Sequence, residues 1–153
     1  MRSLELKILP VFYVLTLGGL MAGTAWFTPG FKIALPAGRV IAAGLVSTGI
    51  IVVILGGISF RRAGTTINPR QPSSTSRLVM TGIYRVTRNP MYLGMLLLLL
   101  GWGLILSHAL AFLLATAFVP IMNRMQIGPE ERILTARFGS EFVDYQTAVR
   151  RWL

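Results

Sequence analysis

Residues 8–27 form a stretch of 20 residues without a charged side chain. A helix needs about 20 apolar residues to cross a hydrocarbon core about 30 Å thick, at roughly 1.5 Å per residue. Two further apolar stretches cover residues 37–60 and 90–107. Inside a bilayer every backbone polar group must be hydrogen-bonded within the protein, and helices achieve this one segment at a time. The sequence therefore predicts an all-α, polytopic membrane protein.

A fourth, shorter apolar stretch covers residues 109–122, and the turn at Ser107 and His108 predicts a helical hairpin with the third. Residues 123–153 are polar, but one helical face of this tail is apolar and consists of Leu134, Phe138, Phe142, Tyr145, Val149 and Trp152. We expect Gly139 to divide the tail into two helices, with Ser140 capping the second. The expectation is one domain, residues 1–153, with about four transmembrane helices and a C-terminal helical segment at the membrane surface.

Composition supports the membrane class and excludes several chemistries. Hydrophobic residues make up 54% of the chain and charged residues 13%, unlike an ordinary soluble domain. There is no cysteine, so thiolate metal sites and cysteine nucleophiles are excluded. A single histidine argues against a histidine metal site or a catalytic triad. We therefore predict no metal site.

The net charge of +10 is mostly arginine and is unevenly distributed. The loop 61–89 holds six arginines and no acidic residue, and the tail holds five arginines. The connection between the first two spans has only Lys32 and Arg39. Arginine is concentrated on the cytoplasmic side of membrane proteins, which predicts that both termini and the loop 61–89 are cytoplasmic. The basic charge fits lipid headgroups, and no nucleic-acid motif is present, so no nucleic-acid partner is expected.

Two polar clusters lie on the predicted cytoplasmic side: GIYRVTRNPMYLG, residues 82–94, and GPEERIL, residues 128–134. A purely structural interpretation explains both. Asn89 is a good N-cap, Pro90 suits the first position of a helix, and Pro129 suits the start of another. In a functional interpretation, two helix N-termini face one aqueous pocket, where they hold anions and carboxylates well.

The side chains of these clusters match the groups of one particular ligand. Arg88 offers a forked donor for a carboxylate, and Glu130 or Glu131 could accept two ribose hydroxyls. Tyr92 and Tyr84 could offer a ring face to a cation. A ligand with a carboxylate, an ammonium, a ribose diol and a sulfonium would use all of these groups. S-adenosylmethionine has this combination.

The order of the motifs resembles the isoprenylcysteine carboxyl methyltransferase and phospholipid methyltransferase superfamily, over about residues 64–152. Members are integral membrane enzymes that use S-adenosylmethionine. Their pattern reads Arg-His-Pro-x-Tyr-x-Gly, then, after a helical hairpin, Glu-Glu-x-x-Leu, Phe-Gly and a Tyr near a basic C-terminus. The matching positions are Arg88, Pro90, Tyr92, Gly94, Glu130, Glu131, Leu134, Phe138, Gly139 and Tyr145. Asn89 replaces the histidine of the family, and asparagine carries no proton at neutral pH.

The resemblance implies S-adenosylmethionine as cofactor and a methyl acceptor that is a lipophilic small molecule or a lipid. The expected cofactor site consists of Tyr84, Arg88, Asn89, Pro90, Tyr92, Leu93, Gly94, Glu130 and Glu131, with Arg88 and Glu131 as catalytic residues. Arg150 and Arg151 either close the pocket or bind headgroups, and the sequence favours headgroups.

The leading functional hypothesis is methyl transfer like that of isoprenylcysteine carboxyl methyltransferases. The alternatives are a phospholipid or amine N-methyltransferase and, from another class, a non-catalytic scaffold that binds anionic lipid. The sequence specifies neither the acceptor nor the oligomeric state.

Overall fold

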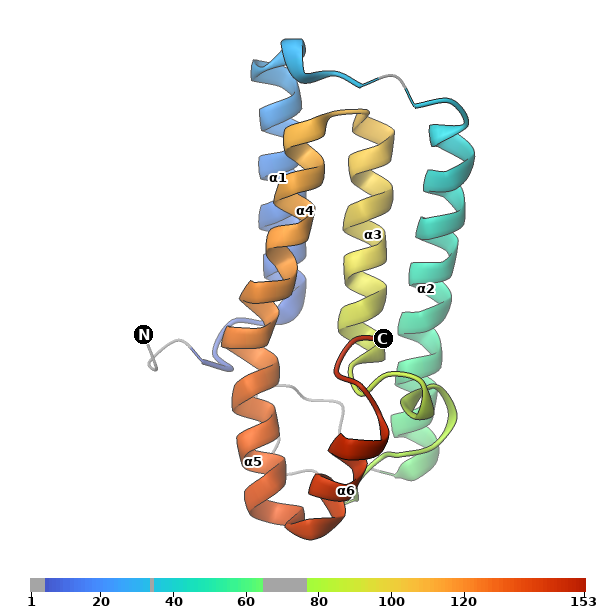
Figure 1. Ribbon diagram of the computed structural model, residues 1–153, viewed down its shortest axis with the longest axis vertical. Coiled ribbons are helices and arrows are strands. Elements are labelled where there is room, and N and C mark those ends of the chain that lie inside the picture. The colour runs from blue at the N-terminus through green and yellow to red at the C-terminus, as the bar shows by residue number, and fades with distance from the viewer. Residues whose placement is uncertain (1–4, 34, 65–76) are drawn as a thin grey trace.

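The computed structural model describes residues 5–33, 35–64 and 77–153, and within them the regular elements are all helices. The main helices of the bundle stand side by side along its long axis (Figure 1) and are α1 (Pro10–Phe27), α2 (Gly38–Ala63), α3 (Pro90–Leu106) and α4 (Ala109–Met122). Two helices lie beyond one end of the bundle, α5 (Gly128–Phe138) and α6 (Ser140–Ala148). The predicted fold class is therefore confirmed. Residues 65–76 of the predicted loop 61–89 lie outside the described residues.

The helices of the bundle suit a membrane. Among the described residues, three helices are long and apolar enough to cross one: α1, α2 and the continuous helix Ala109–Phe138. The 17 residues of α3 are also apolar and measure about 26 Å. Large apolar side chains on the outer surface of the bundle are well exposed, such as Leu15 at 64%, Val40 at 74% and Leu113 at 67%. In a bilayer these side chains contact lipid, so the chain is an integral membrane protein.

Helix α3 lies between the other three and contacts each of them. Its contact with α2 is close because glycines from both helices meet: a Cβ on Gly94 would lie 2.6 Å from the Gly49 carbonyl oxygen, and one on Gly101 would lie 2.7 Å from Val46 Cγ2. Small residues allow helix backbones to approach in this way. On the other side, α1 and α4 pack on α3 around the buried side chain of Phe118.

His108 connects two loops at the end of the bundle opposite α5 and α6. Its buried ring donates through Nε2 to the Thr28 carbonyl oxygen at 2.7 Å. The Ile33 N–H donates to the Ser107 carbonyl oxygen at 2.9 Å. These bonds join the connection between α1 and α2 to the turn between α3 and α4. His108 therefore has a structural position, at the other end of the molecule from the two motif clusters.

The helix that starts at Ala109 does not end where the sequence suggested. A π-helical segment at Asn123–Ile127 joins α4 to α5 without a break. The Gly128 N–H donates to the Asn123 carbonyl oxygen, five residues back. Pro129 lacks an N–H and crowds the preceding turn, and the wider π turn accommodates it. The expectation that Pro129 begins a helix was therefore wrong, and Glu130 and Glu131 lie within a continuous helix.

The division of the tail at Gly139 is confirmed, because α5 ends at Phe138 and α6 begins at Ser140. The expected cap was wrong: Gly139, with φ of +56°, occupies the N-cap position, and no side chain caps α6. The predicted apolar face is confirmed in α6, where Phe142 and Tyr145 are buried while Glu141 is exposed. It does not continue as a helix to Val149 and Trp152, because α6 ends at Ala148.

The glycine contact between α2 and α3 gives a test of this packing. Gly94→Ala should lower the melting temperature of the purified protein in detergent, because the new methyl group meets backbone and Val53 at 2.6 Å. Overpacking of this kind costs about 1–3 kcal/mol. Gly57→Ala in α2 is the matched control, since a Cβ there has no neighbour within 4 Å among the described residues. Equal melting temperatures for the two variants would contradict the packing.

Candidate active site

The segment that leads into α3 is a compact turn. The short 3-10 helix Gly82–Arg85 begins at a glycine with φ of +61°, a conformation that other residues rarely adopt. Thr87 is fully buried, and its hydroxyl accepts a bond from the Asn89 N–H at 3.2 Å. Pro90 then starts α3 with its fixed φ. These local features fix the backbone at Arg88, the residue between the turn and the helix.

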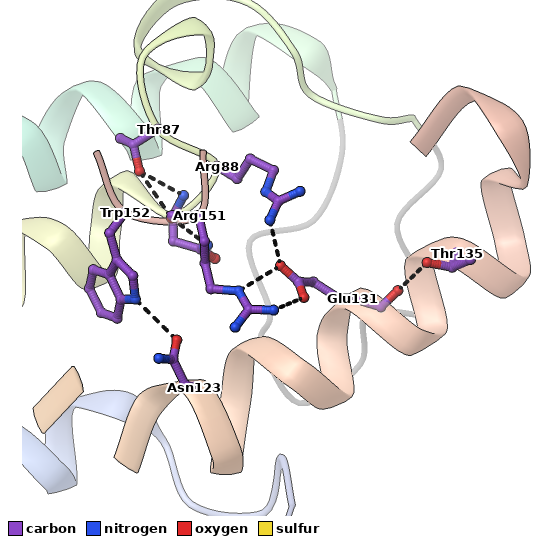
Figure 2. A network of polar contacts seen from close by, with 8 residues as sticks. Thr87, Arg88, Asn123, Glu131, Thr135, Arg151 and Trp152 are labelled. Atoms are coloured by element: carbon purple, nitrogen blue, oxygen red, sulfur yellow. Dashed lines mark hydrogen bonds and ion pairs between the residues drawn. The ribbon is translucent and has the colours of Figure 1, made fainter. Parts of the chain in front are cut away.

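Arg88 joins an ion-pair cluster with Glu131 and Arg151 (Figure 2). Its Nη2 donates to Glu131 Oε1 at 3.1 Å. Arg151 grips the same carboxylate from the other side, with Nε 3.1 Å from Oε1 and Nη2 2.5 Å from Oε2. The side chains of Arg88 and Glu131 are only 11% and 14% exposed. Two guanidinium groups thus share one carboxylate, and the cluster has a net charge of +1.

Arg88 keeps donors that the protein does not use. Within the described part of the chain, its Nε and Nη1 are buried and have no hydrogen-bond partner. Burial lowers the pKa of Arg88, and the neighbouring Glu131 carboxylate opposes that shift. Leaving a buried charged donor unpaired is costly, so such groups indicate a missing partner. A carboxylate is the natural partner of an arginine with two free nitrogens.

A second acidic group lies beside this cluster. The hydroxyl of Tyr92 donates to Glu130 Oε1 at 2.5 Å. Tyr92 lies in the first turn of α3, four residues after Arg88, and Glu130 precedes Glu131 in α5, so both pairs connect the start of α3 to α5. Helix α5 has four charged residues among its 11, so the apolar part of the continuous helix Ala109–Phe138 ends before α5. Burial raises the pKa of Glu130 to about 7, Tyr92's hydrogen bond opposes the shift, and the charge of Glu131 adds to it.

The last five residues, 149–153, which we call the C-terminal strap, lie against the start of α3 (Figure 1). The Arg88 N–H donates to the Arg150 carbonyl oxygen at 3.0 Å. The side chain of Asn89 donates from Nδ2 to the Arg151 carbonyl oxygen at 2.9 Å. Trp152 Nε1 donates to Asn123 Oδ1 at 3.0 Å, as Figure 2 shows. Asn89 thus holds the strap with its side chain and does not cap α3, contrary to the structural interpretation of the sequence.

The structure brings four of the expected site residues together: Arg88, Tyr92, Glu130 and Glu131. The others have different surroundings. Tyr84 packs edge-on against Phe60, with ring centroids 5.4 Å apart, and its carbonyl oxygen accepts a bond from the Tyr145 hydroxyl at 2.7 Å.

Three further residues of the expected site begin α3. Pro90 and Gly94 face α2, and Leu93 is buried. Their part in a cofactor site stays a prediction.

The sequence did not predict the polar contacts of several residues in this region. Arg151 was expected at headgroups, but its guanidinium is part of the ion-pair cluster. Thr87 and Asn123 gave no signal, because single polar residues at helix boundaries are common. Trp152 was identified only as a member of an apolar face. The tail periodicity correctly marked a packed segment, but it did not indicate which polar groups that segment would carry.

Comparison with known proteins agrees with the motifs. The family model of phospholipid methyltransferases matches residues 37–141, more than half of the chain. The chain belongs to the phospholipid methyltransferase family. It is therefore a membrane methyltransferase by family, and the resemblance drawn from its motifs is confirmed. The match includes Arg88 and Glu131 and ends before Arg151.

A curated protein from Haemophilus influenzae (strain ATCC 51907 / DSM 11121 / KW20 / Rd) is similar to this chain and is named only as an uncharacterized protein. The two are 46% identical over 63 residues, which is 41% of this chain and 100% of the relative. No solved structure matches the chain.

The raised pKa of Glu130 predicts how stability depends on pH. The folded protein favours the neutral carboxyl, so this stabilisation is complete below the ordinary pKa of 4.5 and is lost as the pH rises through about 7. The melting temperature of the wild type should therefore fall between pH 5 and pH 8. Glu130→Gln, which stays neutral and still accepts a hydrogen bond from Tyr92, should show a smaller fall. Parallel curves for the two proteins would contradict the assignment.

Proposed function

We propose that this chain transfers a methyl group from S-adenosylmethionine to a lipophilic acceptor that reaches the site from the bilayer. The family supports methyl transfer, and S-adenosylmethionine is the usual methyl donor of such enzymes. The observation that carries the proposal is a pair of buried donors on Arg88, beside Glu131, that have no partner within the described segments. A site prepared for a carboxylate next to acidic groups fits an amino-acid nucleotide.

The groups of the proposed ligand can be matched to the residues around the cluster. Arg88 would bind the carboxylate through Nε and Nη1. Glu131 already accepts hydrogen bonds from Arg88 and Arg151, and its remaining acceptor capacity would serve a ribose hydroxyl. Glu130, when ionised, and the ring of Tyr92 would face the cationic part. When bound, S-adenosylmethionine supplies an activated methyl group on a sulfonium. The protein then has to align the acceptor and exclude water, which favours dispersal of the positive charge.

We further propose that the site and both termini are cytoplasmic. In the described residues, the end of the bundle with the site also has three exposed arginines, Arg61, Arg62 and Arg85. The opposite end has only Lys32 and Arg39 as basic residues in the described segments. This asymmetry agrees with the positive-inside rule.

The acceptor belongs to one of two chemical classes. A carboxylate or thiolate, as for an isoprenylcysteine-type substrate, is already ionised and needs no general base. The amine of a phospholipid, which the family description favours, has to lose a proton. Glu130 is positioned for that role because it lies next to the cluster and has a pKa of about 7. A labelled-methyl assay against a membrane extract, with identification of the labelled product, decides between the classes.

The non-catalytic alternative makes a different prediction. A scaffold that binds anionic lipid through exposed arginines would show weak, salt-sensitive lipid binding and no saturable nucleotide binding. The buried donors of Arg88 argue against it, since a headgroup site at the surface does not need them.

Binding of S-adenosylhomocysteine to the protein in detergent, measured by calorimetry, tests the site. Arg88→Ala and Glu131→Gln should each weaken binding by about tenfold or more, because each removes charge-assisted hydrogen bonds of about 1.5–3 kcal/mol. Arg85→Ala, three residues earlier and exposed, is the matched control and should bind as the wild type does. Unchanged affinity in both site variants would refute the site assignment.

The acceptor class predicts a pH profile. With an amine acceptor, the rate of labelled-methyl transfer should rise through pH 7, because Glu130 accepts a proton only when it is ionised. The Glu130→Gln variant should be slow and should lack this rise. With a carboxylate acceptor, Glu130 is not needed as a base, and the rates of both proteins should be flat in this range. An amine-methylating wild type whose profile Glu130→Gln leaves unchanged would exclude Glu130 as the base.

A further inference from the structure

The ion-pair cluster is asymmetric in a way that matters for ligand binding. Arg151 contacts both oxygens of Glu131, at 3.1 Å from Nε and 2.5 Å from Nη2. Arg88 contacts the same carboxylate through Nη2 alone, at 3.1 Å, and its Nε and Nη1 remain without a partner in the described residues. The forked contact thus belongs to the arginine of the C-terminal strap and not to the arginine of the family motif.

This division of contacts keeps Arg88 available. A carboxylate beside a lone guanidinium prefers two parallel hydrogen bonds to it. Without Arg151, Glu131 would be free to turn and form that fork with Arg88. The pair would then be neutral, and a second nitrogen of Arg88 would be occupied. With Arg151 present, the cluster keeps a charge of +1 and two open donors.

We propose that Arg151 is a positioning residue for ligand binding: by holding Glu131 in a forked contact, it leaves Arg88 free to bind the carboxylate of the methyl donor. This inference rests on the proposed function and extends it to a residue outside the part of the chain that matches the family, residues 37–141. Arg151 acts through Glu131 and Arg88 and does not itself contact the carboxylate of the ligand.

The anchoring of the strap supports this role. Asn89 and Thr87 both donate to the Arg151 carbonyl oxygen, at 2.9 Å and 3.3 Å. The neighbouring Trp152 is fixed to Asn123. The strap around Arg151 is therefore bonded both to the turn before α3 and to Asn123 at the end of α4. Because its backbone is fixed in this way, less conformational entropy is lost when the Arg151 guanidinium binds Glu131.

The test compares two ligands that differ only in the carboxylate, S-adenosylmethionine and decarboxylated S-adenosylmethionine. Their dissociation constants are measured by competition with labelled S-adenosylhomocysteine for the wild type and for Arg151→Ala, Arg151→Lys and Arg150→Ala. Arg150→Ala is the matched control, because this substitution removes the same charge from the same strap and the Arg150 side chain is exposed. Lysine at position 151 keeps the charge but lacks the planar fork.

The wild type should prefer the ligand with the carboxylate by about tenfold or more, the usual effect of a charge-assisted bond. Arg151→Ala should lose most of this preference while binding of the decarboxylated ligand changes little. Arg151→Lys should keep part of the preference, and Arg150→Ala should keep all of it.

Four results would count against the inference, and they differ in meaning. If Arg151→Ala weakens both ligands equally, the strap has only a structural role and the positioning role is wrong. If Arg151→Ala tightens both ligands, Arg151 is instead a competitor for Glu131. If the wild type binds neither ligand, the proposed function itself fails. A wild type that binds S-adenosylmethionine but has a preference unaffected by Arg151→Ala overturns this inference alone.

Discussion

The contact between Glu131 and two arginines holds together three parts of the chain that are far apart in sequence. Arg88 comes from the turn before α3, Glu131 from α5, and Arg151 from the C-terminal strap. A carboxylate and a guanidinium that are mostly buried are stable only when they are paired. The cost of separating them therefore keeps α5 and the strap against the end of α3. The buried side chains of Phe142 and Tyr145 add apolar contacts to this polar attachment of the tail.

The same electrostatic requirement explains why part of the site is incomplete. Arg88 is buried with two nitrogens that no residue in the described part of the chain accepts from, which a purely structural ion pair would avoid. Tyr92 and Glu130 add a hydrogen-bonded acidic group beside it, between the start of α3 and α5. A positive cluster and a carboxyl group that can ionise near neutral pH therefore lie side by side at the end of an apolar bundle. This arrangement suits a zwitterionic ligand better than a simple anion.

The sequence determined much of this in advance. Apolar stretches of membrane length require helices, so the spans and the hairpin at Ser107 followed from the physics of the bilayer. The motif order predicted that Arg88 and Glu131 belong together, and they are in contact. The errors concern choices made by tertiary contacts. Proline is common at the start of a helix, but the helix here continues through Pro129 by way of a π-helical segment. Asparagine often caps a helix, but the side-chain amide of Asn89 donates to the carbonyl oxygen of Arg151, 62 residues later. Local preference cannot anticipate either outcome.

The uninterrupted helix from Ala109 has a consequence for where the proposed lipophilic acceptor would meet the site. Its first 14 residues and the 5 residues of the π-helical segment measure about 28 Å together, close to the thickness of the hydrocarbon layer. Glu130 and Glu131 follow within one turn, so a bilayer that covers this apolar length would place them at the depth of the glycerol backbones and phosphates. A lipid could present its polar end at this height while its acyl chains stay among their neighbours. The lipid would not have to be extracted from the membrane. The thickness of the bilayer would then determine how closely the polar end of the lipid matches the height of Glu130 and Glu131.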